Sequence, residues 1–89
     1  MNFLHYEVSA QPGDVIQVFL AGNAAYVRLM DDNNFRRYGS GQHFQFYGGY
    51  YKQSPAIVNA PSAGRWHVVV DLADQVGRVN AEVRLLRSA

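Results

Sequence analysis

Short runs of alternating apolar and polar residues make up most of the chain, and turn-forming residues separate them at intervals of about 8–12 positions. A two-residue period places every second side chain on the same face of a β-strand. The runs therefore predict an all-β fold, a small antiparallel β-sandwich or barrel of about 6–7 strands. No run has the length and period of a crossover helix between parallel strands, so an α/β fold is disfavoured.

The strongest strand pattern is the run 65–72, RWHVVVDL, in which consecutive valines indicate cover on both faces. We expect this run to be a central strand. The run 78–86, RVNAEVRLL, has the cleanest alternation, and a short loop separates the two. The residues expected to pack together in the core are Trp66, Val68 and Val70 from the first run, and Val79, Val83 and Leu85 from the second.

One short helix is expected near residues 32-38. Asp31 and Asp32 can cap its first turn, and Gly39 can end it with a positive φ. The oxygen-rich segment DDNN lacks the alternate spacing of a calcium loop, so a helix cap is the better interpretation. Before this helix, the dipeptide Gly22-Asn23 is expected to join two neighbouring strands as a hairpin.

The chain has 89 residues and a formal net charge of +1, which favour one domain, 1-89, with no particular charged partner. It contains no cysteine, so disulfides and thiolate chemistry are excluded and a cytoplasmic location is expected. The first residues lack the pattern of a secretory signal. No apolar run approaches the roughly 20 residues needed to cross a bilayer, so no membrane partner is expected.

The stretch 35–52, FRRYGSGQHFQFYGGYYK, holds seven of the twelve aromatic residues, interleaved with glycines and basic side chains. No acidic residue occurs between Asp32 and Asp71. A strand is expected at 43–47, and Gly48-Gly49 is expected to break or turn it so that residues 50–54 pair back against it. This part of the chain carries more aromatic surface than an ordinary strand needs.

We expect this stretch to form an exposed aromatic and basic surface that binds a ligand. Tyrosine offers broad contact area, and arginine offers planar hydrogen bonding and stacking. The alternative, that the rings complete the core, is favoured for Phe44 and Phe46 and stays open for the tyrosines. The expected ligand-binding residues are Arg36, Arg37, Tyr38, Tyr47, Tyr50, Tyr51 and Lys52.

No catalytic residue and no metal ligand is predicted. None of the serines lies in a Gly-x-Ser-x-Gly elbow. His67 and Asp71 share a strand face, but four residues of strand separate them by about 13 Å, too far for a dyad. His5, His43 and His67 show no ligand spacing, so we expect them to hydrogen-bond to neighbours or water.

A non-catalytic module for ligand recognition or protein interaction is the preferred function. Its partner is expected to be an anionic or ring-bearing small molecule, or a protein; nucleic acid is disfavoured, and no cofactor is expected. One alternative is a small-molecule enzyme, which would need a pocket with convergent polar groups and displaced pKa values. The other is an oligomerising structural domain, which an extended apolar face or an unpaired edge strand would support.

Three blocks of the sequence carry a resemblance: YVRLMDDNNFRRY, FYGGYYKQSP and GRWHVVVDL. In this order and spacing they resemble a small bacterial all-β family known only as a domain of unknown function. Some members of that family stand alone, and some are joined to TIR domains. The resemblance implies a compact bacterial domain that also occurs as an accessory module. It brings no catalytic residues, substrate or cofactor to any position of this chain.

Overall fold

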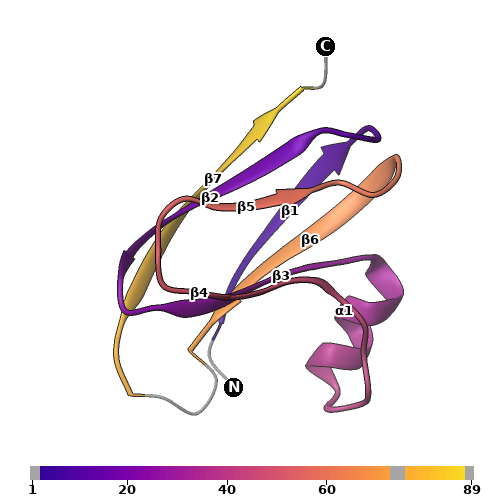
Figure 1. Ribbon diagram of the computed structural model, residues 1–89. Helices are drawn as coiled ribbons and strands as arrows, with labels where there is room; N and C mark the ends of the chain where they lie inside the picture. Colours follow the sequence, from indigo (N-terminus) through magenta and orange to yellow (C-terminus); the bar gives the residue numbers. More distant parts are fainter. Residues whose placement is uncertain (1–2, 73–75, 88–89) are drawn as a thin grey trace.

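The structure, a computed structural model, describes residues 3–72 and 76–87. The strands in these residues form two antiparallel sheets (Figure 1), which confirms the predicted all-β sandwich. The four-stranded sheet has the order β1-β6-β3-β4, and the three-stranded sheet has the order β5-β2-β7. The elements are β1 (Leu4–Ala10), β2 (Val15–Gly22), β3 (Ala25–Met30), α1 (Asp32–Gly39), β4 (Tyr47–Tyr51), β5 (Ala56–Asn59), β6 (Gly64–Asp71) and β7 (Val79–Leu86).

β6 is a central strand, as its run of valines predicted. It pairs with β1 from Leu4↔Val70 to Ala10↔Gly64, and with β3 on its other side. Its inner face contributes Trp66, Val68 and Val70 to the core between the sheets, and all three side chains are buried. Opposite them, Val79, Val83 and Leu85 of β7 are partly buried against the same core, which confirms the predicted packing.

The connection at Gly22-Asn23 is not a hairpin between neighbouring strands, which corrects the sequence-based expectation. β2 belongs to the three-stranded sheet and β3 to the four-stranded sheet, so the chain changes sheets here. Gly22 has a φ of +108°, and the backbone N–H of Asn23 donates to the Arg78 carbonyl at 2.8 Å. The turn is therefore bonded to the start of β7 and does not close β2 onto β3.

The expectation of two strands around Gly48-Gly49 is also wrong. Both glycines lie inside the single strand β4, which pairs with β3 at the edge of its sheet, and residues 43–46 are not a strand. Gly48 has a φ of +121°, and a Cβ atom there would lie 2.2 Å from the Val27 carbonyl oxygen. The glycine thus permits close approach of β4 to β3 where another residue would be strained.

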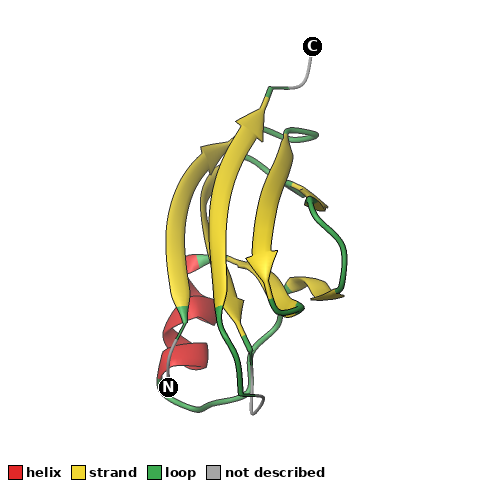
Figure 2. Cartoon of the chain, turned by 90° about the vertical axis from the view of Figure 1, so that its left-hand side faces the viewer, coloured by secondary structure: helices red, strands yellow, loops and turns green. Residues whose placement is uncertain are grey.

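The predicted short helix is present as α1. The Asp31 side chain accepts a hydrogen bond from the Asn34 N–H at 2.8 Å, as expected of an N-cap. The helix lies on the outside of the sandwich, at the end where β3 finishes (Figure 2). Tyr38 packs there with Met30 and Val69 in a second apolar cluster. Within residues 3–72 and 76–87, no helix has the length and apolar character needed to span a bilayer.

Candidate functional site

Arg36 and Arg37 of the predicted surface lie on the exposed side of α1, whereas Tyr38 lies on its buried side. Arg36 and Arg37 are exposed on α1. Tyr38 is only 4% exposed, so its predicted place on the surface is wrong. Because Phe35 and Tyr38 are three residues apart on a helix, they share the face that packs on the sheet. Tyr38 therefore contributes to the attachment of α1 and is not accessible to a ligand.

The tyrosines of β4 alternate between the two faces of the sheet. Tyr47 and Tyr51 pair with inward-facing residues of β3, and Tyr51 is half-buried against the core. Tyr50 points to the outer face, where its ring centroid lies 5.0 Å from that of Tyr26. Tyr47, on the inner face, remains 52% exposed because β4 is an edge strand.

The predicted residues do not form one continuous surface. Lys52 follows the end of β4 that pairs with Ala25, whereas α1 begins just after Met30, at the other end of β3. The five residue steps from Ala25 to Met30 separate these ends by about 17 Å. Arg65, also expected in a region without acids, pairs with the Glu7 carboxylate at 3.4 Å. Of the seven candidates, Tyr47 alone lines the cleft at the end of β3.

An open cleft of about 470 Å³ lies where β3 passes into α1. Its walls come from the end of β3, the start of α1, the segment before β4 and the start of β6. The cleft combines aromatic rings with carboxylate, amide and imidazole groups. Its lining residues are Leu29, Met30, Asp31, Asn34, His43, Phe44, Gln45, Phe46, Tyr47 and Trp66.

Hydrogen bonds and ring contacts fix the walls of this cleft. The side-chain oxygen of Asn34 accepts the backbone N–H of Gln45 at 2.8 Å, which ties the segment before β4 to the helix. The Tyr47 ring meets the Trp66 indole edge-on, with centroids 6.0 Å apart. The indole N–H donates to the Ser62 carbonyl at 3.0 Å, so a hydrogen bond and a ring contact both hold the Trp66 side chain in place. These contacts hold the walls of the cleft in place.

Beside the cleft, the outer face of the four-stranded sheet holds a buried ionic cluster. The Arg28 guanidinium forms an ion pair with Asp71 and lies 4.4 Å from the Tyr26 ring centroid. The Tyr38 hydroxyl donates to Asp71 at 2.6 Å. Burial, followed by the hydrogen bond to Asp71, raises the pKa of Tyr38 well above its ordinary value. The Arg28 guanidinium therefore makes its contacts within the protein and does not form part of a ligand-binding surface.

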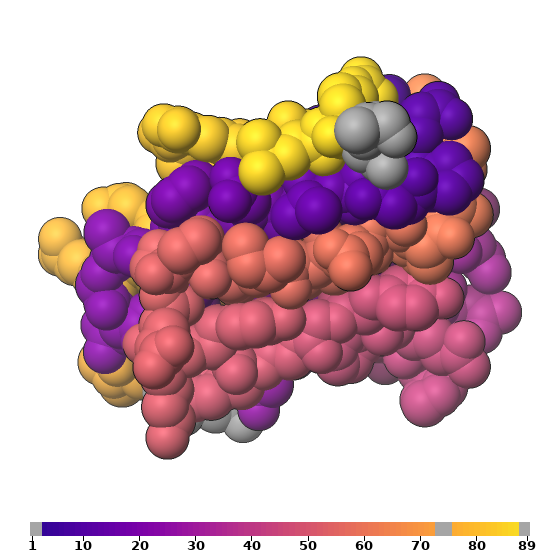
Figure 3. Space-filling model, turned by 45° about the horizontal axis from the view of Figure 1, so that its top comes forward, coloured from indigo at the N-terminus to yellow at the C-terminus, as the bar shows by residue number. Residues whose placement is uncertain are grey.

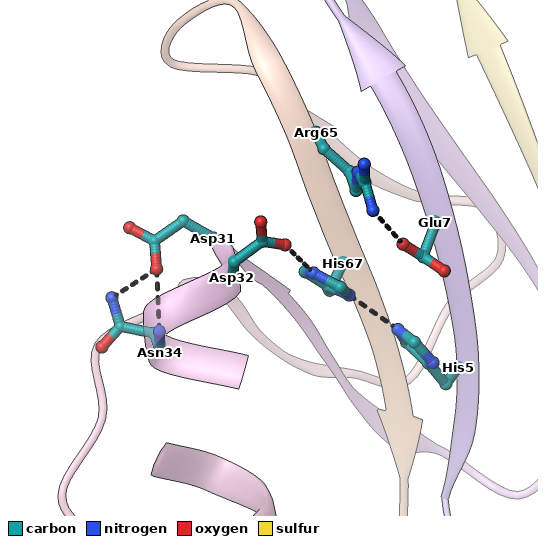
Figure 4. A network of polar contacts seen from close by, with 7 residues as sticks. All are labelled: His5, Glu7, Asp31, Asp32, Asn34, Arg65 and His67. Atoms are coloured by element: carbon teal, nitrogen blue, oxygen red, sulfur yellow. Dashed lines mark hydrogen bonds and ion pairs between the residues drawn. The ribbon is translucent and has the colours of Figure 1, made fainter. Parts of the chain in front are cut away.

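A second polar network joins two histidines that the sequence separates widely (Figure 4). His5 Nε2 lies 2.8 Å from His67 Nδ1, and His67 Nε2 pairs with Asp32. With both imidazoles neutral, His5 donates to His67, and His67 donates to the carboxylate. The Phe35 ring stacks on both imidazoles, at 4.2 Å from His5 and 4.4 Å from His67. His43 lies apart, in the cleft.

This pairing bears out the expectation of hydrogen-bonded histidines for His5 and His67, and it identifies partners that the sequence did not suggest. Asp32, not Asp71, is the carboxylate next to His67. Burial lowers the pKa of His5, and the neighbouring His67 lowers it further, whereas Glu7 opposes the shift. The hydrogen bond with His67 lowers the pKa of Asp32. Among the described residues, no group of three or more potential metal ligands converges.

We expect the free energy of unfolding to fall as the pH decreases below about 6.5. The pKa of His5 in the folded chain lies below its ordinary value of 6.5, so the unfolded chain binds a proton first and protons favour unfolding. The Asp32 contribution, from a pKa lowered below 3.8, is lost at still lower pH. Urea midpoints of the parent and of His5→Gln, between pH 8 and pH 4.5, would measure the difference.

The His5→Gln chain should show a weaker loss of stability between pH 7 and pH 5 than the parent. Circular dichroism must first show that the variant keeps the parent's secondary structure. A parent whose urea midpoint rises as the pH falls through this interval would contradict the prediction.

Most of the cleft residues could not be identified from the sequence. In the sequence, Asp31 and Asn34 were fully accounted for by a helix cap, and Trp66 by the core, so nothing indicated that they would also line a cleft. The available signal was the density of aromatic residues before and at the start of β4, which included Phe44, Phe46 and Tyr47. It indicated the correct segment, but not which side of the sheet would be accessible.

The comparisons with known proteins support the resemblance as far as membership of a domain family of unknown function. Neither the curated proteins nor the solved structures gave a match to this chain. A family model described as "Domain of unknown function (DUF1883)" matches residues 1–89. With the match covering the whole of the sequence, the chain belongs to this family of domains of unknown function.

Proposed function

We propose that this chain is a non-catalytic recognition module that binds its ligand in the cleft beside Tyr47. The observation that carries the proposal is the convergence of four aromatic side chains with carboxylate, amide and imidazole groups around about 470 Å³. Small-molecule sites combine such an apolar lining with a few placed polar groups. The aromatic rings of the cleft provide contact area, and the amides and the carboxylate provide directional hydrogen bonds that can orient a ligand.

The lining favours a neutral, ring-bearing ligand such as a sugar or a nucleoside over an anion. Among the described residues that line the cleft, none is lysine or arginine, and Asp31 contributes a negative charge. Arg36 and Arg37 lie on the helix but not in the lining. An aromatic face can stack on a ring without requiring charge, and planar amides can hydrogen-bond hydroxyl groups.

Binding is favoured over catalysis because the hydrogen-bonded network of two imidazoles and a carboxylate lies outside the cleft, and the cleft's own His43 pairs with no carboxylate among the described residues. The chain from His5 through His67 to Asp32 contributes no residue to the cleft lining. General acid–base catalysis needs such a group within hydrogen-bond reach of the reacting atoms. Within the cleft, Asp31 and Asn34 hydrogen-bond to each other and to the backbone, which gives them a structural role.

The test compares two tyrosines of one strand that face opposite sides. Tyr47→Ala and Tyr50→Ala remove similar rings with exposed fractions of 52% and 39%. Monosaccharides, nucleosides and inorganic phosphate would be titrated against each folded chain, with binding followed by NMR shifts of backbone amides. We expect a neutral ring-bearing compound to shift amides around the cleft, and Tyr47→Ala to weaken its binding about tenfold or more.

Tyr50→Ala should bind like the parent, because Tyr50 lies on the outer face. Binding that persists in Tyr47→Ala but is lost in the pair Arg36→Glu, Arg37→Glu would move the site to the helix and overturn the cleft proposal. A phosphate titration that shifts the same amides more strongly than any neutral compound would overturn the proposed ligand class.

We further propose that the chain acts as a bacterial, cytoplasmic accessory module. The support is the resemblance of its three sequence blocks to family members that stand alone or are joined to TIR domains. The lack of cysteine is compatible with a reducing compartment. Fractionation of a bacterial host that makes the tagged full-length protein, with periplasmic and cytoplasmic marker enzymes, would test the location.

A further inference from the structure

We propose that the free edge of β7 is a pairing site for a second copy of this chain. In the dimer, the two β7 strands would run antiparallel and join the three-stranded sheets into one continuous sheet. This inference concerns a different surface from the cleft and does not depend on the proposed ligand. It rests on the exposed edge of β7, the direction of its peptide groups and the arrangement of its charges.

β7 is a long edge strand with no bulge, proline or glycine to interrupt it. It is last in the order β5-β2-β7, and it pairs with β2 along its whole length, from Gly22↔Val79 to Val15↔Leu86. Figure 3 shows it, in yellow, along the margin of the molecule. Its sequence, VNAEVRLL, contains no proline or glycine, and its register with β2 advances without a bulge. Natural edges that avoid pairing are commonly short, bulged or interrupted by proline.

Two hydrogen bonds show which peptide groups of β7 face this edge. The Leu20 N–H donates to the Ser54 hydroxyl at 2.8 Å, on the β5 side, so Leu20 directs its peptide groups away from β7. Its partner Ala81 therefore directs its own groups away from β2, and its carbonyl accepts the Tyr6 hydroxyl at 3.0 Å. By alternation, Val83 also presents its N–H and carbonyl at the edge. The Ala81 carbonyl keeps a second lone pair for a partner strand.

The charges on β7 select one register for self-pairing. Glu82 and Arg84 point to solvent on the outer face, with 61% and 63% of their side chains exposed. If the two-fold axis passes at Val83, Glu82 lies opposite the partner's Arg84, and the same contact occurs twice. A register centred on Glu82 would instead place two glutamates opposite each other, and one centred on Arg84 would oppose two arginines. The Val83-centred register also places edge-facing peptide groups opposite each other.

These charged side chains are already ordered in the single chain. The Arg84 Nε lies 2.7 Å from a Glu82 oxygen, and its guanidinium lies 5.2 Å from the Phe19 ring centroid. Such pre-ordering reduces the side-chain entropy lost on pairing. On the same outer face, Leu86 is 48% exposed and would lie opposite the partner's Asn80 in this register.

The test is a charge-reversal series measured by sedimentation equilibrium at low salt, over about 10 μM to 1 mM. The parent should associate to twice the chain mass of 10.0 kDa. Glu82→Arg alone and Arg84→Glu alone place like charges opposite each other, and each should weaken self-association about tenfold or more. An equimolar mixture of the two single variants should form a heterodimer, because the all-positive edge then faces the all-negative edge.

The double variant Glu82→Arg, Arg84→Glu restores opposite charges and should recover the parent's association. Arg65→Glu reverses an exposed charge on central strand β6 and serves as the matched control, with association unchanged. A parent that stays monomeric at 1 mM would overturn the proposal. So would a dimer that tolerates both single reversals, or single variants that fail to associate when mixed. Circular dichroism confirms folding of each chain before the comparison.

Discussion

The Asp71→Ala variant is expected to lose about 3–5 kcal/mol of its free energy of unfolding, because it leaves a largely buried cation without its counter-ion. Asp71 is 5% exposed and pairs with Arg28, whose side chain is 13% exposed. The same carboxylate accepts the Tyr38 hydroxyl at 2.6 Å. Its removal would leave a guanidinium and a hydroxyl unsatisfied beneath the helix. In addition, the Nε atom of Arg28 already has no hydrogen-bond partner.

Urea unfolding followed by far-ultraviolet circular dichroism would measure this loss. Glu7→Ala is the matched control, since it breaks an exposed ion pair with Arg65 and should change stability by no more than about 1 kcal/mol. The double variant Arg28→Met, Asp71→Leu removes both charges and should be more stable than Asp71→Ala. If Asp71→Ala is as stable as Glu7→Ala, the ion pair between Arg28 and Asp71 does not stabilise the fold.

This cluster also matters for the cleft, because two residues of β6 hold α1 near both of its ends. Asp71 binds Tyr38, close to the C-terminus of the helix, and His67 binds Asp32, its first residue. The first turn of the helix contributes Asn34 to the cleft lining. The inner face of β6 therefore packs in the core, and its outer face holds the helix that forms one wall of the candidate site.

The sequence predicted those parts of the fold that depend on local pattern. Alternation identified the inner face of β6 and of β7, because each strand must bury one face and each side chain has only two directions to point. The capping residues located the helix. The pairing of strands was harder: Gly22-Asn23 resembled a hairpin, yet the chain changed sheets there. A turn dipeptide indicates where the chain bends but not which strand follows beside it.

The candidate site was predictable as a segment and not as a set of residues. Tyr38 looked like a surface tyrosine until helix packing placed its hydroxyl beside Asp71, thirty-three positions away in the sequence. Trp66 and Tyr47 meet because β6 and β4 flank β3 in one sheet, a relationship that no local pattern encodes. When residues are neighbours only because of the order of strands in a sheet, the sequence contains no periodic pattern that predicts their contact.

Trp66→Ala is expected to lower the free energy of unfolding by about 3–5 kcal/mol, a large share of the roughly 4–13 kcal/mol typical of a chain this long. Trp66 is 7% exposed, lies on the inner face of central β6 and pairs in register with Val8. Alanine would leave a cavity between the sheets and an unpaired Ser62 carbonyl, which now accepts the indole N–H. A loss of this size lowers the melting temperature by about 12 °C or more.

Since Trp66 is the single tryptophan, unfolding must be followed by circular dichroism and not by indole fluorescence. Trp66→Phe keeps an aromatic ring but loses the indole N–H, so it should fall between the parent and the alanine variant. Tyr47→Ala removes the ring that meets the indole, but that ring is half exposed, and the loss should be about 1 kcal/mol or less. If Trp66→Ala melts within a degree or two of the parent, the indole does not fill the core. Its contact with Tyr47 would then be the reason for its position at the rim of the cleft.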